Sequence, residues 1–104
     1  MAEVFYSPKS LDDIERIRDY ICDVLCNPVA ANRIVGEIFK AGDTLAEHPL
    51  MGAQFRSTLP ILTYYRHLPV ENYLVVYRVH GDTVHVARVL HHLQDAISIL
   101  TKDG

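Results

Sequence analysis

Two histidines, His91 and His92, and three arginines, Arg66, Arg78 and Arg88, are the side chains of this sequence best suited to chemistry. Cleavage of RNA without a metal needs a base for the 2′-hydroxyl, an acid for the leaving oxygen and a cation for the charge that develops on the phosphate. Histidine titrates near neutral pH and can serve as base or acid, whereas arginine stays charged. These five side chains are therefore candidates for a nuclease site.

Each candidate also has a purely structural interpretation. A histidine at a strand end is often solvated or bonded to the backbone, and a buried strand arginine needs paired acceptors. The acceptors could belong to an acidic partner protein or to this chain. In the second case we expect them among Glu71, Asp82 and Asp95.

The candidates lie in or beside apolar stretches that predict a sheet. Strands are expected at about Ile61 to Leu68, Tyr73 to Val79 and Thr83 to Leu90, and the last two flank a tight turn at His80-Gly81-Asp82. A further short strand is predicted over Glu3 to Tyr6. Both faces of the Tyr73 to Val79 strand are largely apolar, so something must cover each face.

Two cap-and-proline pairs, Ser7-Pro8 and Asn27-Pro28, each predict the start of a helix. The short connection between these helices makes them antiparallel. Gly36 and Gly42 lie within the second helix, where close approach of the two helices or a bend would explain them. The predicted buried stripe of the first helix consists of Leu11, Ile14, Ile17, Ile21, Val24 and Leu25, with Asp12, Asp13, Glu15, Arg16 and Asp19 on its polar side.

The predicted order is β-α-α-β-β-β followed by a short C-terminal helix from Leu93 to Leu100, which is an α+β fold in which a helical hairpin packs on a mainly antiparallel sheet. We expect residues 1–104 to form one domain, because 104 residues suit a single small core. One helical hairpin covers one sheet face. The C-terminal segment, a second copy or a partner protein is needed for the other.

Composition excludes several classes of function. No apolar run approaches the roughly 20 residues of a membrane span, and the N-terminus lacks the regions of a signal peptide, so we expect a soluble, cytoplasmic protein. The net charge of −3 predicts no independent sequence-specific DNA binding. Cys22 and Cys26 are four residues apart and are expected to be reduced, with no metal and no cofactor.

The stretch LPVENYLVVYRVHGDTVHVARVLHHLQD, residues 68–95, resembles the signature of the ParE/RelE superfamily of bacterial toxins. The similarity to its ParE-like branch extends over nearly the whole chain, through Phe5-Tyr6-Ser7-Pro8 and the stretch from Leu45 to Gly52. This resemblance implies a toxin that is neutralised by a cognate antitoxin and arrests growth by poisoning DNA gyrase. It also implies target binding by the C-terminal segment, through His91, His92, Leu93 and Ile97, and antitoxin binding through Leu74, Val76, Arg78 and Arg66.

The RelE and YoeB branches imply a different activity, ribosome-dependent mRNA cleavage. With the shared strand tyrosine aligned at Tyr77, the catalytic arginine of those branches falls on Leu74, and the tyrosine after their general base falls on Leu93. His92 matches the general base. A nuclease would therefore need His92 with Arg66 or Arg88 in place of the missing arginine. An inactive module that only binds its antitoxin is the third alternative.

Overall fold

A computed structural model describes residues 1–55 and 59–103 of the chain, with the side chains of Leu93, Gln94 and Asp103 excepted. Its elements are β1 (Glu3–Tyr6), α1 (Pro8–Asp19), the π-helical turn η1 (Tyr20–Val24), α2 (Pro28–Glu47), β2 (Ala53–Gln54), α3 (Pro60–Thr63), β3 (Arg66–Val70), β4 (Tyr73–His80), β5 (Thr83–Leu90) and α4 (Leu93–Asp103).

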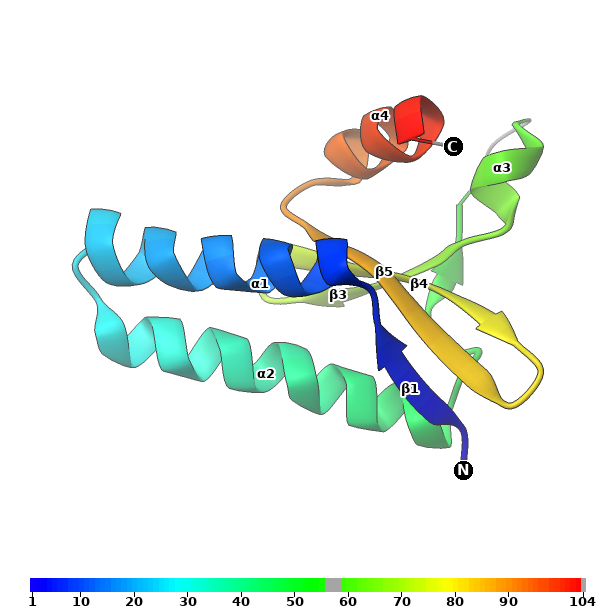
Figure 1. The fold of residues 1–104 in the computed structure, drawn as a ribbon, viewed down its shortest axis with the longest axis horizontal. Coiled ribbons are helices and arrows are strands. Elements are labelled where there is room, and N and C mark those ends of the chain that lie inside the picture. The colour runs from blue at the N-terminus through cyan, green and yellow to red at the C-terminus, as the bar shows by residue number, and fades with distance from the viewer. Residues whose placement is uncertain (56–58, 104) are drawn as a thin grey trace.

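The strands form one sheet in the order β1-β5-β4-β3-β2, in which only β1 and β5 are parallel. Figure 1 shows α1 and α2 side by side on one side of this sheet, with α3 and α4 on the other. The predicted α+β fold is confirmed.

Both predicted helix starts are confirmed by their capping geometry. The Ser7 hydroxyl accepts a hydrogen bond from the Ser10 amide at 3.0 Å, and the Asn27 side chain accepts one from the Ala30 amide at 3.1 Å. Each bond satisfies one of the donors that a helix leaves open at its first turn, and the following proline loses no donor that the helix needs.

The end of α1 differs from the prediction. The regular helix stops at Asp19 and continues as η1. The predicted buried stripe is wrong at its first residue, Leu11, which is 46% exposed. It also fails at its end, where Val24 is 65% and Leu25 54% exposed. In Figure 1 the tip of the hairpin projects beyond the sheet, so these side chains have no sheet to pack against. Both cysteines, at this tip, are free.

Gly42 is required by β1 and not by the other helix. A Cβ at this position would lie 2.0 Å from the hydroxyl oxygen of Tyr6 and 3.8 Å from Val4. A Cβ at Gly36 would meet nothing within 4 Å. The sequence predicted either close approach of the two helices or a bend at these glycines. Close approach holds for Gly42, but the element that approaches it is the N-terminal strand β1.

The segment before β4 is also different. The predicted strand from Ile61 to Leu68 is wrong in its first half, where α3 forms, and β3 spans Arg66–Val70. Pro60 favours a helix start, and Leu62, 1% exposed, packs into the core from α3. Between α2 and α3, the short strand β2 pairs with the first two residues of β3.

A bulge in β5 changes which residues face each side of the sheet. Val76 pairs with Arg88 but Tyr77 pairs with Val86, so Ala87 is an extra residue. Because of this insertion, Val86 and Val89 both pack on the side of α1 and α2, while Leu90 packs on the side of α4.

Two buried clusters hold the layers together. The first cluster, between the helical hairpin and the sheet, consists of Ile14, Ile38, Leu45, Val75, Tyr77, Val84, Val86 and Val89. The second cluster, between the sheet and α3 and α4, consists of Phe55, Leu62, Val76, Leu90, Ala96 and Leu100.

The second cluster shows what covers the other face of β4. Of the three predicted covers, the C-terminal segment is confirmed, with α3 beside it. Leu100 is buried and Ile99 packs against the cluster, whereas Ile97 is 37% exposed. None of the helices in the described part of the chain has the length and apolar composition needed to cross a lipid bilayer.

Candidate functional site

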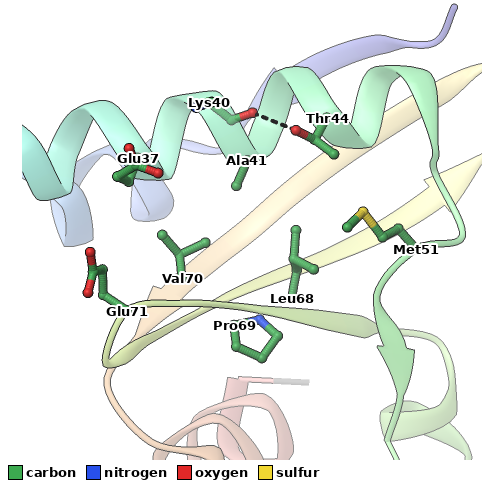
Figure 2. Close-up of a pocket in the computed structure, with 9 residues that line it drawn as sticks. All are labelled: Glu37, Lys40, Ala41, Thr44, Met51, Leu68, Pro69, Val70 and Glu71. Atoms are coloured by element: carbon green, nitrogen blue, oxygen red, sulfur yellow. Dashed lines mark hydrogen bonds between the residues drawn. The ribbon is translucent and has the colours of Figure 1, made fainter.

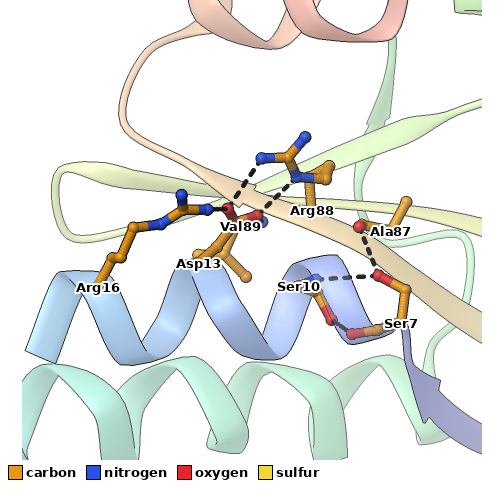
Figure 3. Close-up of polar contacts among 7 residues, drawn as sticks. All are labelled: Ser7, Ser10, Asp13, Arg16, Ala87, Arg88 and Val89. Carbon is orange, nitrogen blue, oxygen red and sulfur yellow. Dashed lines mark hydrogen bonds and ion pairs between the residues drawn. The ribbon is translucent and has the colours of Figure 1, made fainter. Parts of the chain in front are cut away.

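One buried carboxylate, that of Asp13, organises the polar contacts beside β5 (Figure 3). Its two oxygens accept hydrogen bonds from Arg88 Nε at 2.8 Å, Arg88 Nη2 at 2.9 Å, Arg16 Nη2 at 2.9 Å and the Val89 amide at 3.0 Å. The side chain of Asp13 is 5% exposed and that of Arg88 14%. Four donors fill the acceptor positions of a carboxylate, so Asp13 has no further capacity.

The position of Asp13 corrects the prediction that it belongs to the polar side of α1. It lies in a buried stripe with Ser10 and Ile14, facing β5. Strand β1 ends at Tyr6, so the second half of β5 has no neighbouring strand on the edge that faces away from β4, and α1 supplies the missing partners there. Ser7 donates from its hydroxyl to the Ala87 carbonyl at 2.7 Å, and Asp13 accepts the Val89 amide.

The other two candidate arginines are held elsewhere. Arg66 Nη1 donates to the carbonyl oxygens of Gly52 at 2.7 Å and Leu50 at 3.3 Å, and the guanidinium carbon of Arg78 lies 5.6 Å from the ring centroid of Tyr64. The expected acceptors also differ, because Glu71 pairs with Arg33 and Arg88 pairs with Asp13.

The structure brings only some of the candidate nuclease residues together: Arg88 and His91 line the same surface hollow, whereas Arg66 and Arg88 are separated by the sheet. Arg66 is opposite Tyr77 in the sheet and Arg88 is opposite Val76, so the two arginines start from opposite faces. His92 follows β5, four residues beyond Arg88, at the end of the sheet where Tyr73 begins β4. Leu74 packs at the edge of the second cluster.

Two of the predicted target-binding residues, His91 and His92, lie on the surface at the exit of β5. His91 and His92 are exposed, with ring centroids 4.0 Å apart, and the ring of His91 lies 5.2 Å from that of Tyr73. Ile97 is partly exposed on α4. Leu93 begins α4, and its side chain lies outside the described residues.

Among the predicted antitoxin-binding residues, exposure differs. Val76 has no exposed surface, because α4 and α3 cover it, so it offers an antitoxin no contact in this conformation. Leu74, Arg66 and Arg78 are half-buried.

A surface depression, here called the exit groove, lies between α1, the start of β4 and the end of β5. It consists of two adjoining hollows of about 300 and 290 Å³. Both are lined by Arg16, Ile17, Tyr73 and His91. Tyr20 completes the outer hollow, and Asp13, Arg88, Val89, Leu90 and Ile99 complete the inner one.

The protonation of Tyr73 bears on what the exit groove can bind. Burial raises the pKa of the Tyr73 phenol, and the nearby Tyr20 raises that pKa further. Tyr73 therefore remains a neutral hydrogen-bond donor throughout the physiological pH range. Within the described residues there is no group of three or more histidine, cysteine, aspartate or glutamate side chains placed to hold a metal.

A second depression, the α2–β3 groove, has a volume of about 320 Å³ (Figure 2). Ala41 from α2 and Leu68 and Val70 from β3 point toward one another across it. The other residues that line it are Glu37, Lys40, Thr44, Met51, Pro69 and Glu71. An apolar floor with charges of both signs at the rim is typical of a protein-binding surface.

Comparison with known proteins assigns the chain to a family. Residues 4–96 match the family model for the ParE toxin of the type II toxin–antitoxin system, parDE. The chain is also 35% identical to Toxin RelE2 of Caulobacter vibrioides over 91 residues, which cover 88% of this chain and 96% of that protein. The chain belongs to the ParE toxin family of type II toxin–antitoxin systems.

Further relatives of this ParE-family chain agree with the fold. Toxin RelE3 of Caulobacter vibrioides is 28% identical over 90% of this chain and 98% of that protein. The chromosomal ParDE system from P. aeruginosa is similar with a TM-score of 0.71 and 25% identity, over 88% of this chain and 96% of that one. The Mycobacterium tuberculosis RelBE2 toxin–antitoxin complex has a TM-score of 0.66 at 19% identity, over 88% and 98%, a likeness of fold alone.

Sequence reasoning missed four residues that shape the site of this ParE-family protein: Asp13, Arg16, Tyr20 and Tyr73. Three of them share the spacing i, i+3 and i+7 in the first predicted helix, which places them near one face. That spacing was a usable signal for Asp13, because Ser10, Asp13, Ile14 and Ile17 follow the same stripe. The end of the first strand at Tyr6 was predicted, but nothing in the sequence indicated that this strand pairs with β5 and so leaves the second half of β5 open to the helix.

Proposed function

We propose that this ParE-family chain arrests growth by binding DNA gyrase and stabilising the state in which the DNA is cut. The main support for this proposal is that other groups of the protein already bind the arginines that a nuclease would need. Arg88 is held by Asp13, Arg66 by two loop carbonyls, and Leu74 occupies the position expected for a phosphate-binding arginine. The match of residues 4–96 to the ParE toxin family model also favours the ParE-like activity over mRNA cleavage.

The surface proposed to meet the target is the exit of β5 and the outer side of α4. His91 and His92 are exposed there, and Ile97 presents an apolar side chain on the same segment; Leu93 remains a predicted member of this surface. Aromatic and imidazole rings beside an aliphatic contact are suited to a compact protein interface.

A plasmid cleavage assay with the purified chain, gyrase and ATP tests the proposal. We expect linear, enzyme-linked DNA to accumulate and the cognate antitoxin to prevent it. The double variant His91→Ala/His92→Ala should lose this effect. The control His80→Ala, which replaces an exposed histidine at the end of β4, should keep it. Growth arrest without any cleaved DNA would contradict gyrase as the target.

The second candidate function is mRNA cleavage on the ribosome. It is favoured by the exposure of His92 at the end of β5, which leaves its imidazole accessible to a substrate. In that case His92→Ala would abolish mRNA cleavage and leave antitoxin binding intact. Unchanged cleavage by the variant would exclude His92 as the base. A chain that arrests no host when expressed alone would favour the inactive module.

We further propose that a cognate antitoxin binds across the α2–β3 groove. The apolar floor fits the hydrophobic side of an antitoxin segment, and Lys40, Glu37 and Glu71 fit its charged side. Binding roles for Arg66, Arg78 and Leu74 stay predictions.

The groove proposal is tested with the antitoxin encoded beside the toxin gene. Met51→Asp places a charge within the groove and should weaken the complex at least about tenfold in a titration calorimetry experiment, a loss of roughly 1.4 kcal/mol. Leu50→Asp is the matched control, because this neighbour is exposed and does not line the groove. Equal affinities of both variants and the parent chain would place the antitoxin elsewhere.

A further inference from the structure

The exit groove shares His91 with the proposed gyrase-binding surface, but its other lining residues have no part in the proposed contacts with gyrase and antitoxin. It places one well-exposed guanidinium, that of Arg16, beside the rings of Tyr20, Tyr73 and His91. The volume of each hollow, near 300 Å³, is at the lower end for small-molecule sites. This combination of shape, charge and rings points to a specific ligand.

The inner end of the groove carries a net positive charge. Asp13 is shared by two arginines, Arg16 and Arg88, so the three groups together have a charge of +1. All acceptor positions of Asp13 are filled, so it cannot also compete for a cation in solution. The Arg16 side chain is 70% exposed, and its Nη2 donates to Asp13. A guanidinium has five N–H donors in all, so Arg16 can also bind an anionic ligand.

The other carboxylates of α1 are Asp12, Glu15 and Asp19, all exposed. None of them lines either hollow. Their charge weakens the attraction for an anion at long range, but it does not occupy the groove. The chain as a whole is acidic, so a ligand must gain affinity from contacts within the groove.

The rings supply such contacts. His91 lies against Tyr73 with a centroid distance of 5.2 Å, and Tyr20 is half exposed at the outer hollow. Stacking on aromatic side chains is the usual way in which proteins hold an unpaired base, and arginine is the usual partner of a phosphate. A nucleotide combines both features in one small ligand, because its base is an aromatic ring and its phosphate is an anion.

We propose that the exit groove binds one nucleotide unit of single-stranded nucleic acid, with the base against Tyr20, Tyr73 and His91 and the phosphate at Arg16. The nucleotide site adds a ligand to the proposed toxin function, and its biological role rests on that proposed function. Both proposed targets, cut DNA on gyrase and mRNA on the ribosome, contain nucleic acid that a nucleotide site could contact. Binding by the purified chain does not require toxicity, so the two proposals can fail separately.

Fluorescence anisotropy with labelled ten-residue dT and U oligonucleotides tests the proposal at low salt. We expect saturable binding whose salt dependence has a log–log slope near about −0.7, the value for one contacted phosphate on a single strand. Arg16→Gln should weaken binding at least about fivefold and bring the slope close to zero. Tyr20→Leu should weaken it about as much and leave the slope unchanged, because it removes stacking and not charge.

Two matched controls separate the groove from the general surface. Arg18→Gln removes the same charge from the exposed side of α1, and Tyr64→Leu removes an exposed tyrosine from α3's end; both should bind like the parent chain. An equal loss in Arg16→Gln and Arg18→Gln would overturn the proposal, since it would show non-specific attraction. Thermal unfolding of each variant verifies that the fold is intact.

The probes also distinguish the source of the ligand. AMP that competes with the oligonucleotides at a similar concentration would show a site for free nucleotides, whereas strong preference for the oligonucleotide supports a polymer. A duplex of equal length that binds as tightly would overturn the proposal. Tighter binding of a short peptide of alternating glutamate and tyrosine would overturn it in favour of a protein ligand.

Discussion

The two sides of the sheet are built differently. On the side of α1 and α2, long-range polar contacts accompany the first cluster: Asp13 binds Arg88, and the buried Tyr77 hydroxyl accepts from the Gly52 amide at 2.9 Å and donates to the Pro49 carbonyl at 2.7 Å. On the side of α3 and α4, the second cluster is apolar and includes the last helix of the chain. Directional bonds therefore fix the register of the first side, whereas the described side chains that form the second cluster are held by apolar packing.

This difference suggests how the molecule divides its tasks. A chain end held by apolar contacts opens locally at a lower free energy than a helix bonded to the sheet interior. The proposed target surface belongs to this less constrained part, while the exit groove lies at the boundary of the two. Each of the following predictions tests the contrast, beginning with the largest effect.

Removal of the buried carboxylate should have the largest effect. Asp13→Ala leaves the Arg88 guanidinium buried without its partner and the Val89 amide without an acceptor, and should lower the free energy of unfolding by about 3–5 kcal/mol. Urea denaturation measures this loss. The control Asp12→Ala, one residue earlier and exposed, should change stability by about 0.5 kcal/mol or less. If Asp13→Ala and Asp12→Ala lowered the free energy of unfolding by the same small amount, the bonds of Asp13 would not stabilise the side of α1 and α2.

A cavity in the second cluster should have a smaller and more local effect. Leu100→Ala removes a 5%-exposed side chain and should cost about 2–3 kcal/mol. Hydrogen exchange should show lost protection in α4 while the amides of α2 remain protected. Ile97→Ala, on the same helix but partly exposed, should leave α4 protected. Equal loss of protection in α2 would show that the two sides unfold together.

Removal of the Tyr77 hydroxyl tests how much individual hydrogen bonds stabilise the side of α1 and α2. Tyr77→Phe leaves the Gly52 amide and the Pro49 carbonyl without their partner and should cost about 1–2 kcal/mol. Thermal unfolding monitors the change. Tyr64→Phe, whose parent side chain is 58% exposed, is the control and should be neutral. A neutral Tyr77→Phe would mean that water replaces the hydroxyl.

The smallest expected effect is a pH dependence of stability that arises from a histidine on the side of α3 and α4. Burial lowers the pKa of His67, whose Nδ1 atom is buried without a hydrogen-bond partner among the described residues, and whose ring packs on Phe55 at 4.7 Å. As pH falls, the unfolded chain therefore takes up a proton first. Stability should be full above the ordinary pKa of 6.5 and decline below it, toward the lowered pKa.

The substitution His67→Gln should remove this part of the pH dependence, as measured by the urea midpoint between pH 7.5 and 5. His80→Gln, which replaces an exposed histidine on the same sheet, should retain it. A decline that is identical in parent chain and His67→Gln would assign the effect to other groups.

Much of the fold followed from local signals. Ser7-Pro8 and Asn27-Pro28 fixed the helix starts, and His80-Gly81-Asp82 fixed the hairpin, because cap and turn chemistry depends on a few adjacent residues. Helix α3 was missed because Ile61 and Leu62 suit a strand as well as a helix, and only packing against α4 decides between them.

The site was harder to predict than the fold. The identity of Asp13 as the partner of Arg88 depends on residues 75 positions apart, and on the bulge at Ala87 that shifts the register of β5. No local pattern in the sequence reports either fact. His91 and His92 were placed correctly at the exit of β5, but the neighbouring Tyr73 and Arg16 arrive from other elements.

The parallel pairing of β1 with β5 has a consequence for how the protein is made. The first strand to be synthesised, Glu3–Tyr6, has its partner in Thr83–Leu90, so the first cluster cannot close until nearly the whole chain exists. Pairings so distant in sequence slow folding, because a long loop must close before any contact stabilises it. We therefore expect nascent chains that end before β5 to remain unfolded and harmless, so that toxicity begins only once β5 has been synthesised.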